Sequence, residues 1–474
     1  MTIENFLLMR NEISLIVVIL LLLIGEIFVN NKKTIINLAL ILFIIHTIIG
    51  FMPLETGEFF GGSFRTNNLI NFFKSVLNIG VIIVLLQAHD WVTDELRLKN
   101  KSSEFYILLF ATLLGMYYMV SAGDFLMLFI GIELATIPTA ALVAYDTSKI
   151  KSAEAGIKFI LSAALATGVS LFGISMLYAS TGSIYFEQVS ILLTNTPLAT
   201  LGFLFFFAGI AFKVSLVPFH FWTADTYEGA PISVASYLSV ISKASAVFVM
   251  IMLLFTVFQS LSEIWTNVLY GIAIATMFIG NLFALRQKNM KRFLAYSSIA
   301  QAGFILLGML GNSQLGVTTV VYFSAIYIFS NLAAFGVVQS ISLKTGKENI
   351  DDYNGLYRTN PKLSLVMLMA LFSLAGIPPV AGFFGKFFLF TAAASKGFYL
   401  LVFIAVINVT ISLYYYLLVV QAMFIRKSDN PIPAYKNSLT TKIGLVIAIM
   451  GIFVIGLYSP LYEYIGEISN FVFR

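Results

Sequence analysis

Long apolar runs separated by short polar stretches repeat along the whole chain of 474 residues. Most runs reach roughly 18 residues or more, the length at which a helix can cross the hydrocarbon core of a bilayer. Reading these runs against the loop residues between them predicts about fourteen transmembrane helices. The expected spans are 13–29, 34–54, 69–88, 104–121, 124–145, 154–179, 198–218, 230–256, 263–284, 294–311, 315–342, 362–394, 397–425 and 441–461.

The fold class that follows is all-α, with the chain 1–474 forming a single polytopic membrane domain. The loops are short, so no separate soluble domain is expected. The N-terminal run lacks the short apolar core and small-residue cleavage site of a signal peptide, and we interpret it as a true span.

Composition agrees with a lipid-embedded chain and excludes several kinds of site. Hydrophobic residues make up 59% and charged residues only 11% of the sequence, against about 25% charged residues in soluble domains. With no cysteine, the chain offers no disulfide, thiolate metal site or cysteine-ligated iron–sulfur cluster. The scattered histidines His46, His89 and His220 argue against a histidine metal site. The net charge of +5 arises from loop residues and does not indicate nucleic-acid binding.

Lysines and arginines in the predicted loops fall mainly on one side of the membrane. Of the 28, 19 lie in alternate loops and only four on the opposite side. Because cytoplasmic loops are enriched in Lys and Arg, this bias predicts both termini on the non-cytoplasmic side. The 19 are Lys32, Lys33, Arg97, Lys99, Lys101, Lys149, Lys151, Arg286, Lys288, Lys291, Arg292, Lys344, Lys347, Arg358, Lys362, Arg426, Lys427, Lys436 and Lys442; the four are Arg10, Arg65, Lys396 and Arg474.

The remaining five lysines lie inside predicted spans, where a charge costs about 2.5–3.5 kcal/mol at the bilayer centre. They are Lys74, Lys158, Lys213, Lys243 and Lys386. Glu133 lies in the middle of the fifth span. Buried lysines and carboxylates can change protonation near neutral pH, so Glu133, Lys213, Lys243 and Lys386 are candidates for a proton relay.

A structural interpretation competes for every one of these residues. Each can form an interhelical ion pair or extend its charged end to the interface. That alternative stays open especially for Lys74 and Glu26, and for Lys158, which has Glu154 one helical turn away. His220 is either a loop residue or a member of the relay.

Two spans carry helix-breaking residues close to a candidate lysine. Pro218 follows Lys213 in span 7, and Gly376, Pro378, Pro379 and Gly382 precede Lys386 in span 12. Interrupted helices at corresponding positions of two halves are typical of inverted-repeat transporters. We therefore expect helices 1–3 in 1–103, a first five-helix repeat in 104–256, an inverted second repeat in 263–425, and helix 14 in 441–461.

These breaks give a geometric prediction. The helices should be interrupted at about Val214–Pro218 and Gly376–Gly382, with Lys213 and Lys386 facing the freed backbone groups. Lys213, Lys243, Lys386 and Glu133 should lie along one polar line inside the protein.

Several segments resemble a known family. The segment Phe212–Pro231, FKVSLVPFHFWTADTYEGAP, together with GIELATIP, KRFLAYSSIAQAGF and GIPPVAGFFGKF, is similar to the antiporter-like subunits of respiratory complex I and of multisubunit Na⁺/H⁺ antiporters. The YEGAP form, with Ser242 and Lys243 downstream, is most similar to the subunit N branch. The resemblance covers about residues 10–460.

The resemblance implies roles for matching residues. Glu133 and Lys213 would form a charged pair, Lys158 would tune that pair, Lys243 would lie on a central hydrophilic axis, and Lys386 would serve the exit side. It also implies that this chain binds no cofactor, with flavin, iron–sulfur clusters and quinone held by other subunits. The implied neighbours are the antiporter-like subunit M, the small subunit K and membrane lipids.

The function expected from the resemblance is proton translocation within a bacterial inner-membrane NADH:quinone oxidoreductase, an enzyme of the translocase class. The alternatives left open are a subunit of a multisubunit Na⁺/H⁺ antiporter, a non-pumping membrane scaffold, and a carrier for an organic solute.

Overall fold

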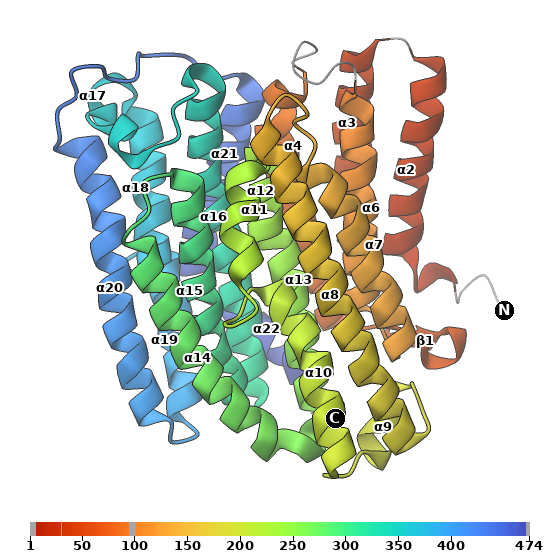
Figure 1. Cartoon of the computed structure of the whole chain (residues 1–474). Coiled ribbons are helices and arrows are strands. Elements are labelled where there is room, and N and C mark those ends of the chain that lie inside the picture. The colour runs from red at the N-terminus through yellow and green to blue at the C-terminus, as the bar shows by residue number, and fades with distance from the viewer. Residues whose placement is uncertain (1–5, 30, 94–100, 471–474) are drawn as a thin grey trace.

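A computed structural model describes residues 6–29, 31–93 and 101–470, and helices dominate it (Figure 1). The first part of the chain contains α2 (Arg10–Phe28), α3 (Lys32–Gly50), β1 (Gly57–Phe59), η1 (Phe60–Gly62), β2 (Phe64–Thr66), α4 (Asn68–Val92), α6 (Ser102–Val120), α7 (Phe125–Val143), α8 (Ile150–Thr181), α9 (Phe186–Leu192), α10 (Pro197–Val214), α11 (Phe221–Gly229), α12 (Ile232–Tyr237), η2 (Leu238–Ser242) and α13 (Lys243–Thr256). The second part contains η3 (Gln259–Leu261), α14 (Ser262–Ala284), α15 (Met290–Leu310), α16 (Gln314–Thr345), η4 (Ile350–Tyr353), α17 (Leu356–Thr359), α18 (Pro361–Ala375), α19 (Ala381–Ala394), α20 (Tyr399–Phe424), α21 (Leu439–Leu457) and α22 (Ser459–Ser469).

The predicted number of spans is confirmed. Within the described residues, thirteen helical segments are long and apolar enough to cross a membrane. The shorter apolar helices α18 and α19 follow one another where the remaining span was expected. The chain is therefore a multi-pass membrane protein. One small departure from all-α is the antiparallel hairpin β1–β2, which joins α3 to α4.

The position of each helix within the bundle could not be taken from its hydropathy. In the most apolar 18-residue stretch of α12–α13, of α15 and of α16, 94–100% of the residues are buried. In the corresponding stretches of α2 and α8, only 28% and 22% of the residues are buried. All of these helices are apolar around most of their circumference, because lipid and protein interior accept the same side chains. The first three form the centre of the bundle, and α2 and α8 present broad faces outward.

The two predicted helix breaks are confirmed. Helix α10 ends at Val214 and α11 begins at Phe221, while α18 ends at Ala375 and α19 begins at Ala381. In each broken helix, the residue that follows the first half has a positive φ. It is Ser215 after α10, with φ of 67°, and Gly376 after α18, with φ of 88°. The two broken helices run in opposite directions, since α11 lies above α10 but α19 lies below α18 (Figure 1).

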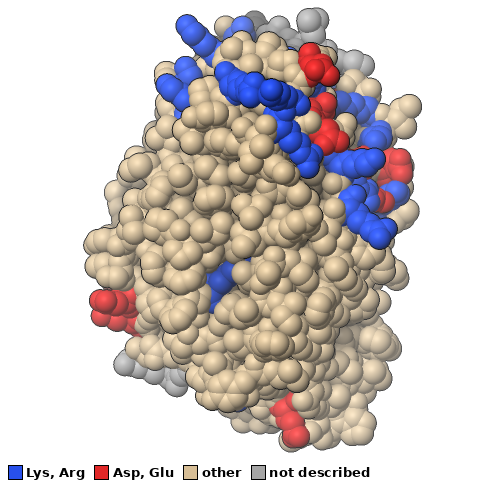
Figure 2. Space-filling model, turned by 90° about the vertical axis from the view of Figure 1, so that its left-hand side faces the viewer, with Lys and Arg blue, Asp and Glu red and all other residues tan. Residues whose placement is uncertain are grey.

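On the face shown in Figure 2, most charged side chains gather at one end of the molecule, above a broad belt that is mostly uncharged. Exposed basic residues at this end include Lys344, Arg358, Lys362, Arg426 and Lys427, near the ends of α16, α17, α18 and α20. This is the end to which the sequence assigns the cytoplasmic loops. Arg97 and Lys99, assigned to this side, and Arg474, assigned to the opposite side, lie outside the described residues.

Candidate functional site

Lys386 lies on α19 and binds the end of the helix that precedes it. Its Nζ donates to the carbonyl oxygens of Leu374 at 2.8 Å and Ala375 at 3.0 Å, the last residues of α18. A helix end leaves its final carbonyls without intrahelical donors, and the break creates such an end inside the bundle. The ammonium also lies 4.7 Å from the centre of the Phe304 ring. The geometry predicted for Lys386 at the break is confirmed.

Lys243 begins α13 directly after the π-helical turn η2. It is 2% exposed, and its Nζ donates to the Oγ of Ser298 at 2.9 Å and the carbonyl of Ser298 at 3.3 Å. No carboxylate lies within 4 Å of this ammonium among the residues the structure describes. A π-turn inside an α-helix is a common feature of functional sites, and here it sets the rotation at which Lys243 meets α15.

Hydrogen-bonded side chains connect the neighbourhoods of Lys243 and Lys386. The Leu374 carbonyl that accepts from Lys386 also accepts from Gln301 Nε2 at 2.9 Å. Gln301 donates to the Tyr416 hydroxyl at 3.2 Å, and Tyr416 bonds Ser297 at 2.5 Å. Ser297 is the residue before Ser298, the partner of Lys243. Polar side chains therefore extend from each of these two lysines to neighbouring residues of α15, while the polar line through Lys213, Lys243, Lys386 and Glu133 stays a prediction.

A second group of polar side chains lies along the same central helices. Asn331 of α16 donates to Ser239 at 2.5 Å and to Tyr327 at 2.8 Å, and Ser239 and Tyr327 bond each other at 3.1 Å. Tyr227, whose hydroxyl is buried, lies beside Ser239 and Ser298. These residues continue the polar interior from the Lys243 region toward α11.

Lys213 faces into the protein but does not bind the break in its own helix, so that part of the prediction is wrong. Its Nζ donates to Thr136 Oγ1 at 2.5 Å and to the Ile132 carbonyl at 3.3 Å, both on α7. The freed end of α10 is bound instead by Trp222, whose Nε1 donates to the Phe212 carbonyl at 3.0 Å.

Glu133 lies beside Lys213 without a direct ion pair between them. The two groups are close enough to interact electrostatically, yet no contact within 4 Å joins them in the described part of the chain. Glu133 Oε1 is buried, with no hydrogen-bond partner among the residues that the structure describes. The expected pair is therefore open in this structure, with Lys213 held by Thr136, one turn of α7 from Ile132.

His220 occupies the break between α10 and α11. Its side chain is 7% exposed, and its Nδ1 is buried without a hydrogen-bond partner. Nearby segments carry further buried hydroxyls in the same condition. They are those of Ser215, Thr223, Thr226, Tyr227 and Ser233. His220 thus sits in a polar part of the interior.

Lys158 lies elsewhere, at the surface, and its contacts differ from those expected of a residue that tunes Lys213. It is 46% exposed and binds Glu154 and Asp225 at 2.8 Å each. Arg292 binds Asp225 at 2.7 Å and Glu228 at 2.9 Å, and Lys151 binds Glu228 at 3.0 Å. These six side chains form what we call the α8–α11–α15 network, which surrounds a cavity of about 160 Å³.

The network determines the ionisation of its two carboxylates on α11. Partial burial acts to raise the pKa of Asp225, but hydrogen bonds from Lys158 and Arg292 outweigh it, and the net pKa is lowered. The pKa of Glu228 is likewise lowered by Arg292 and Lys151 against the effect of burial. Both groups are therefore ionised at neutral pH.

The sequence reasoning missed the partner of Lys74. Helix α2 begins at Arg10, three residues before the predicted span, so Glu12 lies inside the helix. Its Oε1 is 2.5 Å from Lys74 Nζ, and both side chains are fully buried. A carboxylate within one turn of an apolar run is the signal that could have placed Glu12 in the interior.

Lys291, assigned to a loop, is also buried and binds Glu348 at 3.2 Å.

Two observations concern bound groups. Among the described residues, no cluster of three or more His, Asp or Glu side chains could hold a metal ion.

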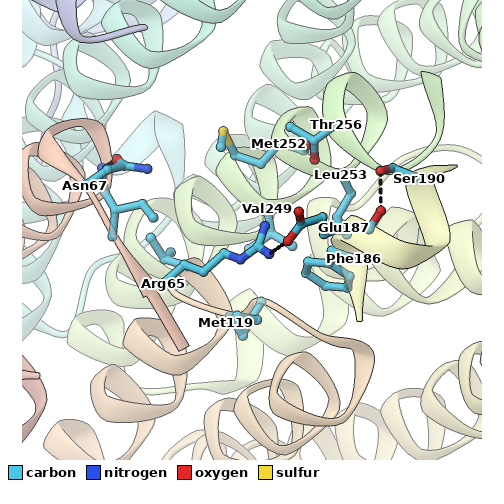
Figure 3. Close-up of a pocket in the computed structure, with 13 residues that line it drawn as sticks. Arg65, Asn67, Met119, Phe186, Glu187, Ser190, Val249, Met252, Leu253 and Thr256 are labelled. Carbon is cyan, nitrogen blue, oxygen red and sulfur yellow. Dashed lines mark hydrogen bonds and ion pairs between the residues drawn. The ribbon is translucent and has the colours of Figure 1, made fainter. Parts of the chain in front are cut away.

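A cavity of about 210 Å³ lies between the hairpin, α9 and α13 (Figure 3). Its one arginine, Arg65, binds Glu58 at 2.9 Å and Glu187 at 3.3 Å. Because both partners are acidic, the guanidinium is neutralised and the cavity offers no free cationic group.

Comparison with known proteins places this arrangement in a family. The model of the family described as NADH:quinone oxidoreductase/Mrp antiporter, TM matches residues 122–412. The NADH-quinone oxidoreductase subunit N of Phocaeicola vulgatus is 49% identical over 470 residues, covering 98% of this chain and 99% of the relative. The chain belongs to the NADH-quinone oxidoreductase subunit N family. The subunit N of Azobacteroides pseudotrichonymphae is also 49% identical, covering 99% of each chain.

Solved structures agree with the subunit N family assignment. A chain of respiratory complex I from Thermus thermophilus with bound aureothin is 26% identical, with a TM-score of 0.81 over 96% of this chain and 98% of that one. A chain of the Mrp complex from a Dietzia species is 18% identical, with a TM-score of 0.86 over 100% of this chain and 98% of that one. The second likeness concerns the fold alone.

Proposed function

We propose that this chain is a proton-translocating membrane-arm subunit of an NADH:quinone oxidoreductase, a membrane enzyme of the translocase class. The observation that carries the proposal is the placement of Lys243 and Lys386. Both ammonium groups are buried without a carboxylate contact among the described residues, and hydrogen-bonded side chains connect their surroundings. Buried ionisable groups at membrane depth are costly, and proton transfer is the usual function that retains them.

The proposed mechanism begins at Glu133 and Lys213. In this structure, Lys213 binds Thr136 and the Ile132 carbonyl. Movement of the ammonium to Glu133 would favour the protonated lysine, and its return to Thr136 would favour proton release. Two charges 4 Å apart interact by about 4 kcal/mol at an effective dielectric constant of 20. That exceeds the roughly 2.3 kcal/mol needed to move one charge against 100 mV.

A released proton would next reach Lys243 and then Lys386. The polar groups around Tyr227, Ser239 and Ser298 adjoin the first of these lysines, and Ser297, Tyr416 and Gln301 adjoin the second. Hydroxyl groups both donate and accept hydrogen bonds, which suits them to proton transfer. His220 would take part from the break between α10 and α11, and Lys158 would act only through the α8–α11–α15 network.

The redox chemistry would take place in other subunits, which would hold the flavin, the iron–sulfur clusters and the quinone. Subunits M and K, together with membrane lipids, are the proposed neighbours. The basic end of the bundle (Figure 2) would face the cytoplasm of a bacterial cell, and both termini would face the opposite side of the inner membrane. The repeats in 104–256 and 263–425 would each form one half-channel.

Affinity purification of the tagged chain in mild detergent tests the assembly part of this proposal. Co-purification of the quinone-reducing subunits is expected, whereas recovery of a small antiporter complex would favour the Na⁺/H⁺ antiporter alternative. The single purified chain should show no visible absorption from flavin or haem.

The variants Lys213→Ala and Glu133→Ala test the relay. Each should assemble but lower proton pumping and quinone-linked NADH oxidation together, because the change in pairing drives the transfer. Normal pumping by either variant would favour the scaffold alternative. Thr136→Val serves as a graded variant, since it removes only the hydroxyl that holds Lys213.

A further inference from the structure

The N-terminal helices contain a buried polar cluster that the proposed relay does not use. It comprises Glu12 and Ser14 of α2, His46 of α3, Lys74 and Asn78 of α4, and Tyr117 of α6, with Ser121 at its end. Lys74 and Asn78 are one turn apart on α4, and Tyr117 and Ser121 are one turn apart on α6. The cluster therefore has two layers, an ion-pair layer around Lys74 and a histidine layer around His46.

The ion-pair layer is tightly bound. Lys74 Nζ contacts Glu12 Oε1 at 2.5 Å and donates to Ser121 Oγ at 2.7 Å. The second carboxylate oxygen of Glu12 is buried without a hydrogen-bond partner. The same ammonium lies 5.5 Å from the centre of the Tyr117 ring, which places the two layers in contact.

The histidine layer can accommodate both protonation states of His46. Nδ1 is 2.8 Å from Ser14 Oγ, and Nε2 is 3.0 Å from the Tyr117 hydroxyl. Tyr117 in turn donates to the side-chain oxygen of Asn78, so its hydroxyl oxygen is free to accept from Nε2 of the neutral ring. Asn78 Nδ2 lies farther from the same nitrogen, at 3.4 Å, and we assign the Nε2 proton on the shorter contact with Tyr117. In that state the Ser14 hydroxyl donates to Nδ1.

Ser14 has a second acceptor within reach, the carbonyl of Asn11 at 3.1 Å. When Nδ1 gains a proton, it becomes the donor to Ser14 Oγ, and the serine hydroxyl turns to Asn11. The donors on His46, Ser14 and Tyr117 then each keep an acceptor while no heavy atom moves. A purely structural histidine needs only one of these two arrangements.

The cluster also lies close to an opening. A cavity of about 320 Å³ at the end of α3 and the start of α4 is lined by Gly50, Asn71 and Ser75, among others. A Cβ on Gly50 would lie 3.4 Å from Asn11 Oδ1 and 3.6 Å from Asn78 Nδ2. One layer of side chains therefore separates the cavity from His46. The cavity lies at the end of the bundle where α2 begins.

On its inner side the cluster adjoins the helix of Lys243. The hydroxyl of Tyr237, at the end of α12, bonds Thr112 of α6 at 2.7 Å, and Tyr117 is near enough to Tyr237 to interact electrostatically. Among the described titratable groups, Tyr117 on α6 contacts the His46 ring, and the charged groups of the same cluster are Glu12 on α2 and Lys74 on α4. Arg10 is held at the cavity mouth by the carbonyls of Met52 and Pro53.

We propose that His46, supported by the Glu12–Lys74 pair, is a further proton-binding site that exchanges protons with the aqueous phase at the end of the bundle where α2 begins. A proton arrives from hydronium ion in the cavity, passes through Ser14 and binds Nδ1, leaving water behind; release reverses these steps. Inward transfer runs from Nε2 through Tyr117 toward Tyr237. The inference rests on the proposed proton-translocating function.

The test uses the intact complex in membrane vesicles, with variants His46→Gln and Ser14→Ala. Glutamine keeps a hydrogen-bonding side chain but cannot bind a proton at neutral pH. His89→Gln is the matched control, because His89 lies near the opposite end of α4 and its side chain contacts Asn37 and Asp90 among the described residues. Pumping is measured as protons moved per NADH oxidised, across about pH 6 to 8, the range in which histidine titrates.

We expect both variants to assemble. His46→Gln should lower pumping by about tenfold, less than the roughly 10²–10⁴-fold contribution of an acid–base group placed directly at a reacting centre, and should remove one titration step from the pH profile. Ser14→Ala should shift that step, and His89→Gln should change neither quantity.

Two outcomes overturn the inference. One is normal pumping with an unchanged pH profile in assembled His46→Gln and Ser14→Ala. The other is failure of both variants to assemble, which assigns the cluster a structural role. The variant Lys243→Met separates the two proposals. If it also pumps normally, the proposed function fails; if it stops pumping while the His46 and Ser14 variants pump normally, only the inference about His46 fails.

Discussion

At the scale of single residues, the contrast between Lys74 and Lys243 separates a paired buried charge from an unpaired one. Lys74 contacts a carboxylate at 2.5 Å, whereas the hydrogen-bond partners of Lys243 in the described part of the chain are the hydroxyl and carbonyl of Ser298. Breaking a buried ion pair leaves the other charge uncompensated. A buried charge with no opposite charge beside it costs free energy of desolvation in the folded state. Removing such a charge is therefore expected to leave stability unchanged or to increase it.

The variant Lys243→Met tests this distinction, because methionine retains an unbranched apolar stem and lacks the ammonium. We expect the purified chain to unfold at the same temperature or a higher one, while NADH-driven proton pumping by the complex falls by at least about tenfold. Thermal unfolding in detergent and quenching of a pH-sensitive dye in vesicles measure the two effects.

Lys362→Met is the matched control, since Lys362 is exposed near the start of α18. It should leave both measurements unchanged. A large loss of thermal stability in Lys243→Met would instead indicate that the lysine is mainly structural.

At the scale of elements, the break between α18 and α19 holds Lys386 through backbone geometry. Gly376 has φ of 88°, a conformation that costs an L-residue roughly 1–2 kcal/mol. A Cβ at this position would also lie 3.1 Å from Lys386 Cδ. The break thus fixes the lysine by contact as well as by its free carbonyls.

Gly376→Ala should therefore both destabilise the chain and lower pumping, because Lys386 must move from the added methyl group. Gly397→Ala is a closely matched control. Gly397 has φ of 83°, and a Cβ there would meet nothing within 4 Å. Its variant should show a similar backbone cost, about 1–2 kcal/mol, with normal pumping. Equal loss of pumping in the two variants would contradict this account.

The α8–α11–α15 network connects three helices at the charged end of the bundle. Its carboxylates have lowered pKa values, so their stabilising contribution is present above the usual carboxylate pKa and is lost as the pH falls through the lowered values. Asp225→Asn should reduce the free energy of unfolding at pH 7 by about 0.2–1 kcal/mol, the range of exposed ion pairs.

At a pH well below the lowered pKa values, where both carboxylates are protonated, the difference between the Asp225→Asn variant and the unaltered chain should disappear. Thermal unfolding in detergent at both pH values measures it. Asp351→Asn is the control, since Asp351 is 77% exposed and has one contact, with Arg426 at 3.6 Å. A difference that persists in acid would contradict the ionic explanation.

At the scale of the whole molecule, the absence of cysteine allows the orientation to be measured directly. Ser395 is exposed in the connection between α19 and α20, and Asn430 is exposed between α20 and α21. These connections lie at opposite ends of α20. The distribution of basic residues assigns Asn430 to the cytoplasmic side and Ser395 to the other side.

In cells whose outer membrane has been permeabilised and whose inner membrane is intact, a membrane-impermeant maleimide should label Ser395→Cys and not Asn430→Cys. Inside-out vesicles should give the reverse result. The unaltered chain, which has no thiol, is the control for background labelling. Labelling of both variants from one side would contradict the predicted number of spans between these two positions.

The sequence by itself determined the number of spans, the two helix breaks and the family. Apolar length is set by bilayer thickness, and proline and glycine act locally on the backbone, so neither depends on neighbouring helices. The same holds for the five lysines inside spans, because their cost is visible from hydropathy alone. The motif around Lys213 and His220 is by itself sufficient to indicate the family, since its residues are contiguous in the chain.

Only the tertiary structure decided which groups these side chains meet. It placed Lys213 on Thr136, Lys158 at the surface with Asp225, and Glu12 against Lys74. It also placed α13, α15 and α16 at the centre and α8 outside. The physical reason is that lipid and protein interior accept the same apolar surface. Hydropathy therefore cannot set the rotation of a helix, and that rotation determines the partner of each buried charge.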